Sequence, residues 1–172
     1  ICDGYKKAFR LGRITTLQKL IAQEGIEFVS FLELADFILL TYDDRDPAAK
    51  EFQDIMAQAL TQKLFILCTN PDRVYVEGAA FVPAAGSIAA VYEAMGGQVK
   101  YIGKPYPLIY QTLVEQSQIK GNILAIGDTL EVDILGAQNM GWDTLLVLTG
   151  VSALQYEGNP NNINPKYIIN NL

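Results

Sequence analysis

The sequence of 172 residues lacks histidine altogether, and this absence excludes several kinds of catalytic site. Without an imidazole the chain supplies neither the base of a serine or cysteine catalytic triad nor a histidine ligand for zinc. Cysteine is almost as scarce, since Cys2 and Cys68 are the only two, too few for a disulfide framework. Cys68 lies in the apolar run LFILC and is expected to be a buried thiol in a reducing compartment, so a cytoplasmic location is predicted.

Long hydrophobic runs and an excess of positive charge are also missing. The longest apolar runs, FILL and LFILC, are far shorter than the roughly 20 residues that a helix needs to span a bilayer. Lys and Arg number 13 against 19 Asp and Glu, which gives a formal net charge of −6. An acidic surface repels the phosphates of nucleic acids and of anionic membranes, so we expect neither as a partner.

Hydrophobic residues make up half of the sequence and occur in strand-length runs separated by amphipathic stretches of helical length. This alternation predicts an α/β fold with parallel strands and right-handed crossovers. Strands are expected at 35–42, 63–68, 99–102, 122–126, 144–148 and, at an edge, 166–169. Helices are expected at 16–23, 47–60, 107–116, 131–140 and from Gly86 to the Gly96-Gly97 pair. The pattern becomes more regular after that pair, so we place a domain boundary between 1–97 and 98–172.

Two carboxylates follow the strand predicted at 122–126. Ligands of open parallel sheets bind beyond the carboxyl ends of the strands, which is where Gly127-Asp128-Thr129-Leu130-Glu131-Val132-Asp133 begins. Asp128 at the strand end and Asp133 near the first turn of the next helix suit a hard cation that retains several waters, which describes magnesium. Asp128 and Glu131 also fit a capping box, a purely structural role, so the motif alone leaves both interpretations open.

Lys104 strengthens the functional interpretation. It follows the strand predicted at 99–102, one strand–helix unit before the acidic pair, within Gly103-Lys104-Pro105-Tyr106-Pro107. Its ammonium group is expected to enter the same mouth of the sheet, where it can hold a phosphate and balance a carboxylate. A solvated loop lysine, which is what most loop lysines are, is the structural alternative, but the ordered set of one lysine and two aspartates favours the functional interpretation.

These two motifs together resemble those of the haloacid dehalogenase (HAD) superfamily, in particular its NagD-like branch of phosphatases. Three further stretches agree with the resemblance: Thr69-Asn70-Pro71-Asp72, Gly86-Ser87-Ile88 and Leu148-Thr149-Gly150-Val151. The resemblance is strongest from Thr69 to Val151 and weaker from Ile1 to Asp46. It implies a Rossmann-like core, of which 98–172 is the C-terminal half, and a large α/β cap formed by 1–97.

The resemblance also implies the chemistry, that of a magnesium-dependent phosphatase acting on small phosphorylated metabolites through an aspartyl-phosphate intermediate. Lys104 corresponds to the lysine that orients phosphate and nucleophile, Asp128 to the metal-binding acid, and Asp133 to a second acid that supports the waters of the metal. Related caps often form dimers, which leaves a homo-oligomer open. The cap loop that closes over the substrate and helps to select it corresponds to Thr69, Asn70, Pro71 and Asp72.

The nucleophilic Asp-x-Asp motif of this superfamily can be placed in two ways. In the first, it lies upstream of Ile1, and the chain is the cap plus the C-terminal half of the core. In the second, the chain is a complete minimal phosphatase in which Asp44 and Asp46 supply the motif and Thr69 the strand-end threonine. We favour the first, because Asp43 intrudes after the strand and a proline follows, a pattern typical of a turn that leads into a helix. The 172-residue chain alone is then predicted to be inactive.

Two functions of other classes are considered beside this one. A receiver-like signalling module also combines acids, a hydroxyl and a lysine, but its acids precede the lysine, whereas Lys104 comes first here. A non-catalytic protein that binds phosphorylated metabolites without turnover would keep Lys104, Asp128 and Asp133 and lack the nucleophile.

Overall fold

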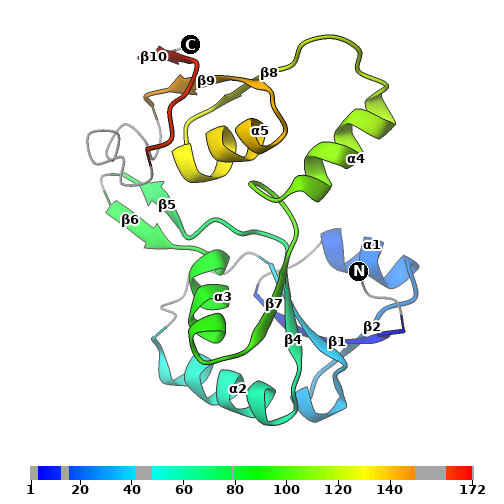
Figure 1. Cartoon of the computed structure of the whole chain (residues 1–172). Coiled ribbons are helices and arrows are strands. Elements are labelled where there is room, and N and C mark those ends of the chain that lie inside the picture. The colour runs from blue at the N-terminus through cyan, green and yellow to red at the C-terminus, as the bar shows by residue number, and fades with distance from the viewer. Residues whose placement is uncertain (1–3, 13–15, 42–47, 79, 150–161, 172) are drawn as a thin grey trace. The chain divides into compact units, whose positions relative to one another are not determined.

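The structure, a computed structural model, describes residues 4–12, 16–41, 48–78, 80–149 and 162–171. It divides into two compact units, one formed by Ile1–Tyr75 and Phe81–Ile102 and the other by Val76–Ala80 and Gly103–Leu172. We call them the N-terminal unit and the C-terminal unit; Figure 1 shows the elements of each. Within the described ranges, no helix is long and apolar enough to cross a membrane.

A five-stranded sheet forms the centre of the N-terminal unit, with the order β2-β1-β3-β4-β7 and parallel pairing throughout. Its strands are β1 (Lys7–Leu11), β2 (Glu27–Val29), β3 (Phe37–Leu40), β4 (Phe65–Cys68) and β7 (Gln98–Tyr101). The unit also contains α1 (Thr16–Gln23), η1 (Leu32–Leu34, a 3-10 turn), α2 (Lys50–Thr61) and α3 (Ala85–Ala94). The apolar runs FILL and FILC become the inner strands β3 and β4, in which every residue is buried, as in parallel sheets covered on both faces.

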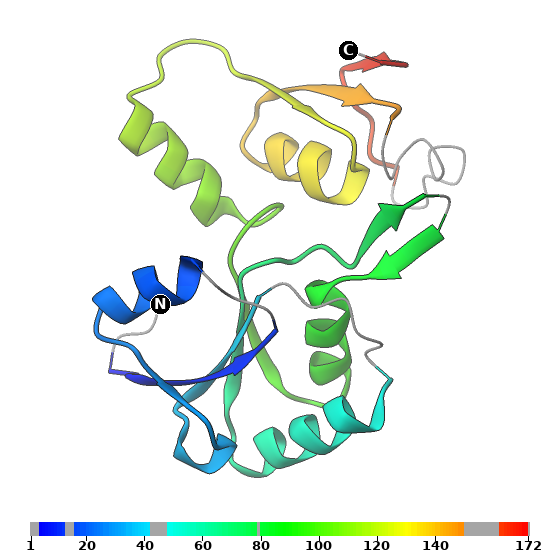
Figure 2. The ribbon, with the colours of Figure 1, turned by 180° about the vertical axis from the view of Figure 1, so that it is seen from behind.

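Helices cover the two faces of this sheet unequally. On one face, α2 and α3 contribute Phe52 and Tyr92 to the larger buried cluster of the unit. On the other face lies α1, whose Ile21 packs against a smaller cluster that contains Phe37 (Figure 2). The second face is therefore the less completely covered one.

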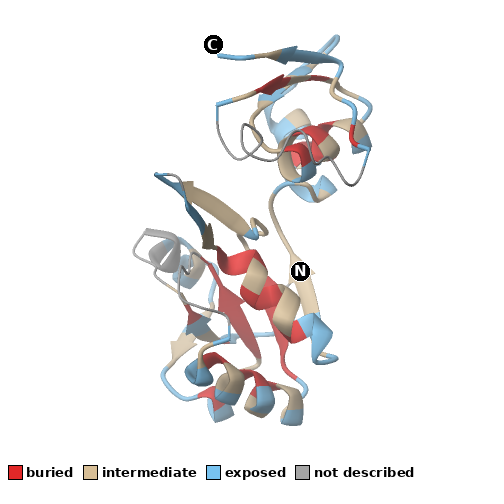
Figure 3. Ribbon diagram, turned by 90° about the vertical axis from the view of Figure 1, so that its left-hand side faces the viewer, coloured by how far each residue is buried: buried red, intermediate tan, exposed pale blue. Residues whose placement is uncertain are grey.

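A three-stranded parallel sheet of order β10-β9-β8 forms the C-terminal unit. Its elements are α4 (Pro107–Ser117), β8 (Leu124–Gly127), η2 (Leu130–Ile134, a π-helical turn), α5 (Leu135–Asn139), β9 (Asp143–Val147) and β10 (Tyr167–Ile169). Its small core gathers Leu130, Ile134, Leu146 and Ile163. Figure 3 shows the buried residues of this unit concentrated on β9 and the turn into α5, whereas Leu124 and Ile126 of β8 are about half exposed, at 47% and 52%.

The α/β fold class predicted from the sequence is confirmed, and most expected helices and strands are present within a few residues of their predicted bounds. Four strands were missed. β1 and β2 are short and carry charged residues at exposed positions, and β5 (Val74–Glu77) and β6 (Ala80–Pro83) form a two-stranded sheet inside a stretch expected to be a loop. The helix expected at 131–140 begins one residue earlier, with the π-helical turn η2.

The position of the boundary between the two parts also differs from the expectation. The sequence pattern placed it at Gly97, which would assign the strand at 99–102 to the C-terminal part. β7 instead pairs with β4, with Val99 opposite Ile66, and so belongs to the N-terminal unit, which ends at Ile102. The partner of a strand is set by long-range pairing, which local sequence patterns do not encode.

Candidate active site

Gly127 and Asp133 organise the turn that follows β8. The side chain of Asp133 folds back over the strand end, where its Oδ2 accepts hydrogen bonds from the backbone N–H groups of Asp128 (3.2 Å) and Thr129 (3.1 Å). A Cβ at Gly127 would lie 2.6 Å from that same oxygen and would overlap the rest of the carboxylate group, so only glycine fits there. A spacing of five residues thus lets the Asp133 carboxylate reach back to the backbone N–H of Asp128 at the strand end. The N-cap position of the turn is Thr129, not Asp128, which counts against a capping box of Asp128 and Glu131.

Lys104 reaches the same turn. Its Nζ donates a hydrogen bond to Oδ1 of Asp133 and forms an ion pair with it; the lysine side chain is 49% exposed and that of the aspartate 12%. The structure therefore brings together the lysine and the acidic motif that the sequence analysis joined. The expected reason was wrong, however, because β7 and β8 lie in different sheets. The two residues meet where the segment after Gly103, a residue with a φ of +114°, lies against η2.

Tyr110 and Gly136, which the sequence analysis missed, lie where that segment meets η2 and α5. A Cβ at Gly136 would lie 2.9 Å from Cα of Pro105 and would overlap the hydroxyl group of Tyr110. The Tyr110 hydroxyl lies 3.4 Å from the carbonyl oxygen of Val132, and its ring contacts Trp142 edge-on at a centroid distance of 5.4 Å. Burial, together with the charge of Asp133, raises the pKa of Tyr110 to about 12, so this hydroxyl remains a proton donor at neutral pH.

The acids of this turn suit a magnesium ion, because magnesium in phosphate-handling sites is typically held by one or two carboxylates, with waters and phosphate oxygens completing its shell. Asp128 and Asp133 are the two candidates, and both carboxylate oxygens of Asp133 already accept hydrogen bonds. Across the part of the chain that the structure describes, no group of three or more His, Cys, Asp and Glu side chains could hold a metal ion. Asp128, which directly follows β8, is the candidate for a direct ligand, with Asp133 beside it as a support.

The predicted substrate loop, Thr69, Asn70, Pro71 and Asp72, lies in the N-terminal unit directly after β4. The backbone N–H of Thr69 donates to the carbonyl oxygen of Leu40 (2.9 Å), and that of Gly86 donates to the carbonyl oxygen of Asp72 (2.9 Å). A Cβ at Gly86 would lie 2.7 Å from the latter oxygen and would overlap the carbonyl group of Pro71. Gly86, which the sequence analysis noted only as part of a motif, is thus the residue that seats this loop against the start of α3.

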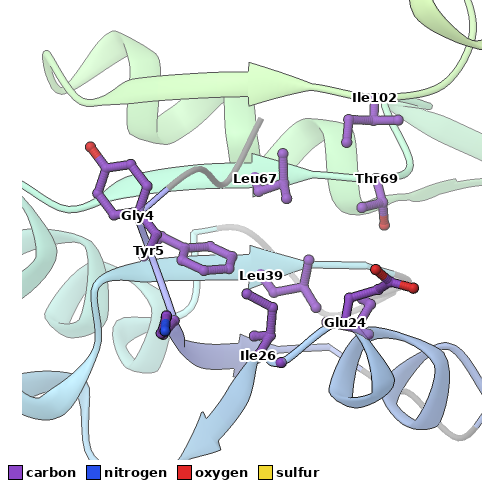
Figure 4. Close-up of a pocket in the computed structure, with 12 residues that line it drawn as sticks. Gly4, Tyr5, Glu24, Ile26, Leu39, Leu67, Thr69 and Ile102 are labelled. Carbon is purple, nitrogen blue, oxygen red and sulfur yellow. The ribbon is translucent and has the colours of Figure 1, made fainter.

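Thr69 also lines a cavity of about 780 Å³ on the less covered face of the five-stranded sheet. In Figure 4, Leu39 and Leu67 lie between Tyr5 on one side and Thr69 and Glu24 on the other. Cys68, just before the loop, is fully buried, as expected, and burial raises its pKa to about 12. The second placement of the nucleophile, at Asp44 and Asp46, lies outside the described residues.

Comparisons with known proteins agree with the resemblance to the HAD superfamily. Residues 101–172 match the family model described as HAD-hydrolase-like. Chronophin of Bos taurus is 33% identical over 121 residues, which cover 69% of this chain and 40% of chronophin. The ribonucleotide monophosphatase NagD of Escherichia coli K12 is 38% identical over 90 residues, which cover 51% of this chain and 35% of NagD. The chain thus spans less than half the length of these two relatives.

Solved structures extend the similarity over both units. The 4-nitrophenylphosphatase of Thermotoga maritima has a TM-score of 0.75 and 28% identity, with 98% of this chain and 63% of that chain covered. The segment matched by the family model contains Lys104, Asp128 and Asp133. These findings confirm the resemblance found in the sequence: the chain is related to the NagD-like phosphatases of the HAD superfamily.

Proposed function

We propose that the protein containing this chain is a magnesium-dependent phosphatase that hydrolyses small phosphate monoesters through an aspartyl-phosphate intermediate. The observation that carries the proposal is the ion pair between Lys104 and Asp133 at the turn where Asp128 follows β8. A lysine held beside a turn that carries two carboxylates can bind a phosphate while the carboxylates bind a divalent ion. The phosphatase relatives support the reaction class.

Each residue of the turn has a distinct part in this proposal. Lys104, with half of its side chain exposed, binds a phosphate oxygen while Asp133 fixes the direction of its ammonium group. Asp128 is the metal ligand, and Asp133 supports the metal through its position beside Asp128. Magnesium, when bound there, supplies Lewis-acid stabilisation of the charge on the phosphate. The nucleophile comes from an Asp-x-Asp motif upstream of Ile1, and the 172-residue chain alone is expected to be inactive.

The substrate-selecting part is assigned to Thr69–Asp72. Backbone hydrogen bonds hold both ends of the loop, one from Thr69 to Leu40 and one from Gly86 to Asp72. This suits a segment that must present polar groups in a fixed arrangement. The substrate class is a small organic phosphate.

The test is hydrolysis of para-nitrophenyl phosphate by the full-length protein, with magnesium and with chelator. We expect magnesium-dependent activity that Asp128→Asn lowers by at least about a hundredfold, since removal of one charged group at such a site costs this order. Asp143→Asn is the matched control, because Asp143 pairs with Lys166 on the surface (2.8 Å), away from the turn. Activity that is indifferent to Asp128→Asn, or that falls equally in the control, would contradict the proposal.

A non-catalytic phosphometabolite-binding protein is the second candidate. It is favoured by one observation, that no group of three or more His, Cys, Asp and Glu side chains within the described residues could hold a metal ion. It predicts that the full-length protein binds inorganic phosphate with magnesium and shows no turnover of any phosphate ester.

A further inference from the structure

The ion pair of Lys104 and Asp133 joins two segments that belong to no common sheet. Lys104 follows the N-terminal unit's last strand, and Asp133 lies in the π-helical turn after β8. The lysine is half exposed, so burial alone does not fix its side chain. Some other contact must hold the backbone beside Lys104 against the turn that carries Asp133.

Tyr110 occupies the position that such a contact requires. It lies in the first turn of α4, is 7% exposed, and places its hydroxyl between the carbonyl oxygen of Val132 and the bare Cα of Gly136. Gly136 approaches Cα of Pro105 as well, the residue directly after Lys104. The Tyr110 side chain and the missing Cβ of Gly136 therefore keep the segment next to Lys104 close to the turn that carries Asp133.

We propose that Tyr110 is a positioning residue for Lys104: its hydroxyl, received by Gly136 and directed at Val132, holds the segment after Gly103 so that the Lys104 ammonium group meets Asp133. Tyr110 acts through Lys104 and does not itself touch a substrate. The kinetic consequence rests on the proposed function, whereas the geometric consequence does not.

The test compares Tyr110→Phe with Tyr92→Phe in the full-length protein. Tyr92 is a second buried tyrosine whose hydroxyl donates to a backbone carbonyl, that of Leu64 at 2.6 Å, but it lies in the N-terminal unit. Both variants lose one hydroxyl and one hydrogen bond and keep the ring, so each is expected to lower the melting temperature by a few degrees. Only Tyr110→Phe is expected to affect Lys104.

Two readouts separate this inference from the proposed function. The first is the ¹H–¹⁵N NMR signal of the Lys104 ammonium group, assigned by its loss in Lys104→Arg. Its hydrogen bond to Asp133 slows proton exchange, so we expect the signal to broaden or disappear in Tyr110→Phe and to persist in Tyr92→Phe. The second is kinetic: in an active enzyme, Tyr110→Phe should lower kcat for para-nitrophenyl phosphate about tenfold while KM changes less than about twofold, because misplacement of an orienting group affects chiefly the transition state.

A third variant tests the contact directly. Gly136→Ala places a methyl group where the Tyr110 hydroxyl lies, so its effect on the melting temperature should be smaller in the Tyr110→Phe background than in the wild type. An unchanged Lys104 signal in Tyr110→Phe overturns the proposal whatever the kinetics, and so does an unchanged kcat in an active enzyme. If the wild type hydrolyses no phosphate ester, the proposed function fails, and the NMR signal still decides the role of Tyr110.

Discussion

Strands of similar composition differ in their burial between the two units. β4 and β8 are both four-residue, largely apolar strands at the foot of a candidate loop, yet all of β4 is buried, whereas β8 alternates between exposed and half-buried residues. β4 lies between β3 and β7, and helices cover both faces of its sheet. β8 pairs with β9 alone among the described strands.

The difference shows that the two candidate loops are held by different means. In the N-terminal unit, the loop at Thr69–Asp72 extends from a strand fixed by a large core. In the C-terminal unit the core is small, and the turn at Asp128–Asp133 is held instead by local contacts at Gly127, Tyr110 and Gly136. In the N-terminal unit, we therefore expect loss of core packing to affect both stability and loop geometry. In the C-terminal unit, we expect the geometry of the turn to depend on single contacts.

The difference between the two units is tested most directly by truncating an isoleucine side chain in each strand. In the 172-residue chain, Ile66→Ala in β4 should cost about 2–5 kcal/mol of unfolding free energy, because Ile66 is fully buried and leaves a cavity. Ile126→Ala in β8 should cost less than about 1 kcal/mol, because half of that side chain is already exposed. Chemical denaturation measures both, and equal costs would contradict the comparison.

A substitution at the seat of the N-terminal loop is expected to have the next largest effect. Gly86→Ala forces a methyl group against the backbone at Pro71 and Asp72, which should cost about 1–3 kcal/mol and shift the loop. Ser87→Ala, in the same helical turn, removes only the hydrogen bond from its hydroxyl to the carbonyl of Arg73 and should cost about 1 kcal/mol. Chemical denaturation measures the loss of stability in both variants. A smaller loss in Gly86→Ala than in Ser87→Ala would show that Gly86 does not pack closely against Pro71 and Asp72.

The smallest expected effect is electrostatic and belongs to the N-terminal unit. The Asp36 carboxylate accepts hydrogen bonds from the backbone N–H groups of Lys6 and Lys7, both at 2.8 Å, and these bonds lower its pKa below the ordinary value of 3.8. The stabilisation is therefore present above that value and is lost as the pH falls through the lowered pKa of the folded state.

Asp36→Asn, which imitates the protonated acid, tests this effect. Relative to the wild type it should be less stable by under about 1 kcal/mol at neutral pH, since the site is largely solvent-screened, and the difference should vanish in strong acid. Asp54→Asn is the control, because Asp54 forms an exposed pair with Lys50 four residues earlier. A difference that persists or grows in strong acid would show that Asp36 stabilises by some other means.

Much of this organisation follows from local sequence. The helix at Thr16–Gln23 and the inner strands β3 and β4 were predicted because a glycine ends the helix and the apolar runs are continuous. The membership of β7 and the existence of β1 were not, because β1 carries charged residues and strand partners are chosen by the whole sheet. Long-range pairing accounts for both errors.

The candidate site shows the same division. Lys104, Asp128 and Asp133 were predicted from their motifs, and the ion pair between the first and the last agrees with that grouping. The residues that make the geometry, Gly136 and Tyr110, carry no motif of their own. A glycine inside a predicted helix was the available signal, since such a glycine often marks a close approach of another segment.

The central claim is that Lys104 and Asp133 act as one unit in phosphate chemistry, and a double-mutant cycle tests it most directly. We would measure kcat/KM for para-nitrophenyl phosphate in the full-length protein with Lys104→Met, Asp133→Asn and both substitutions. The account predicts that the double variant loses little more activity than the worse single variant, because each substitution removes the function of the same pair. Losses that multiply in the double variant would show two independent residues and would contradict the account.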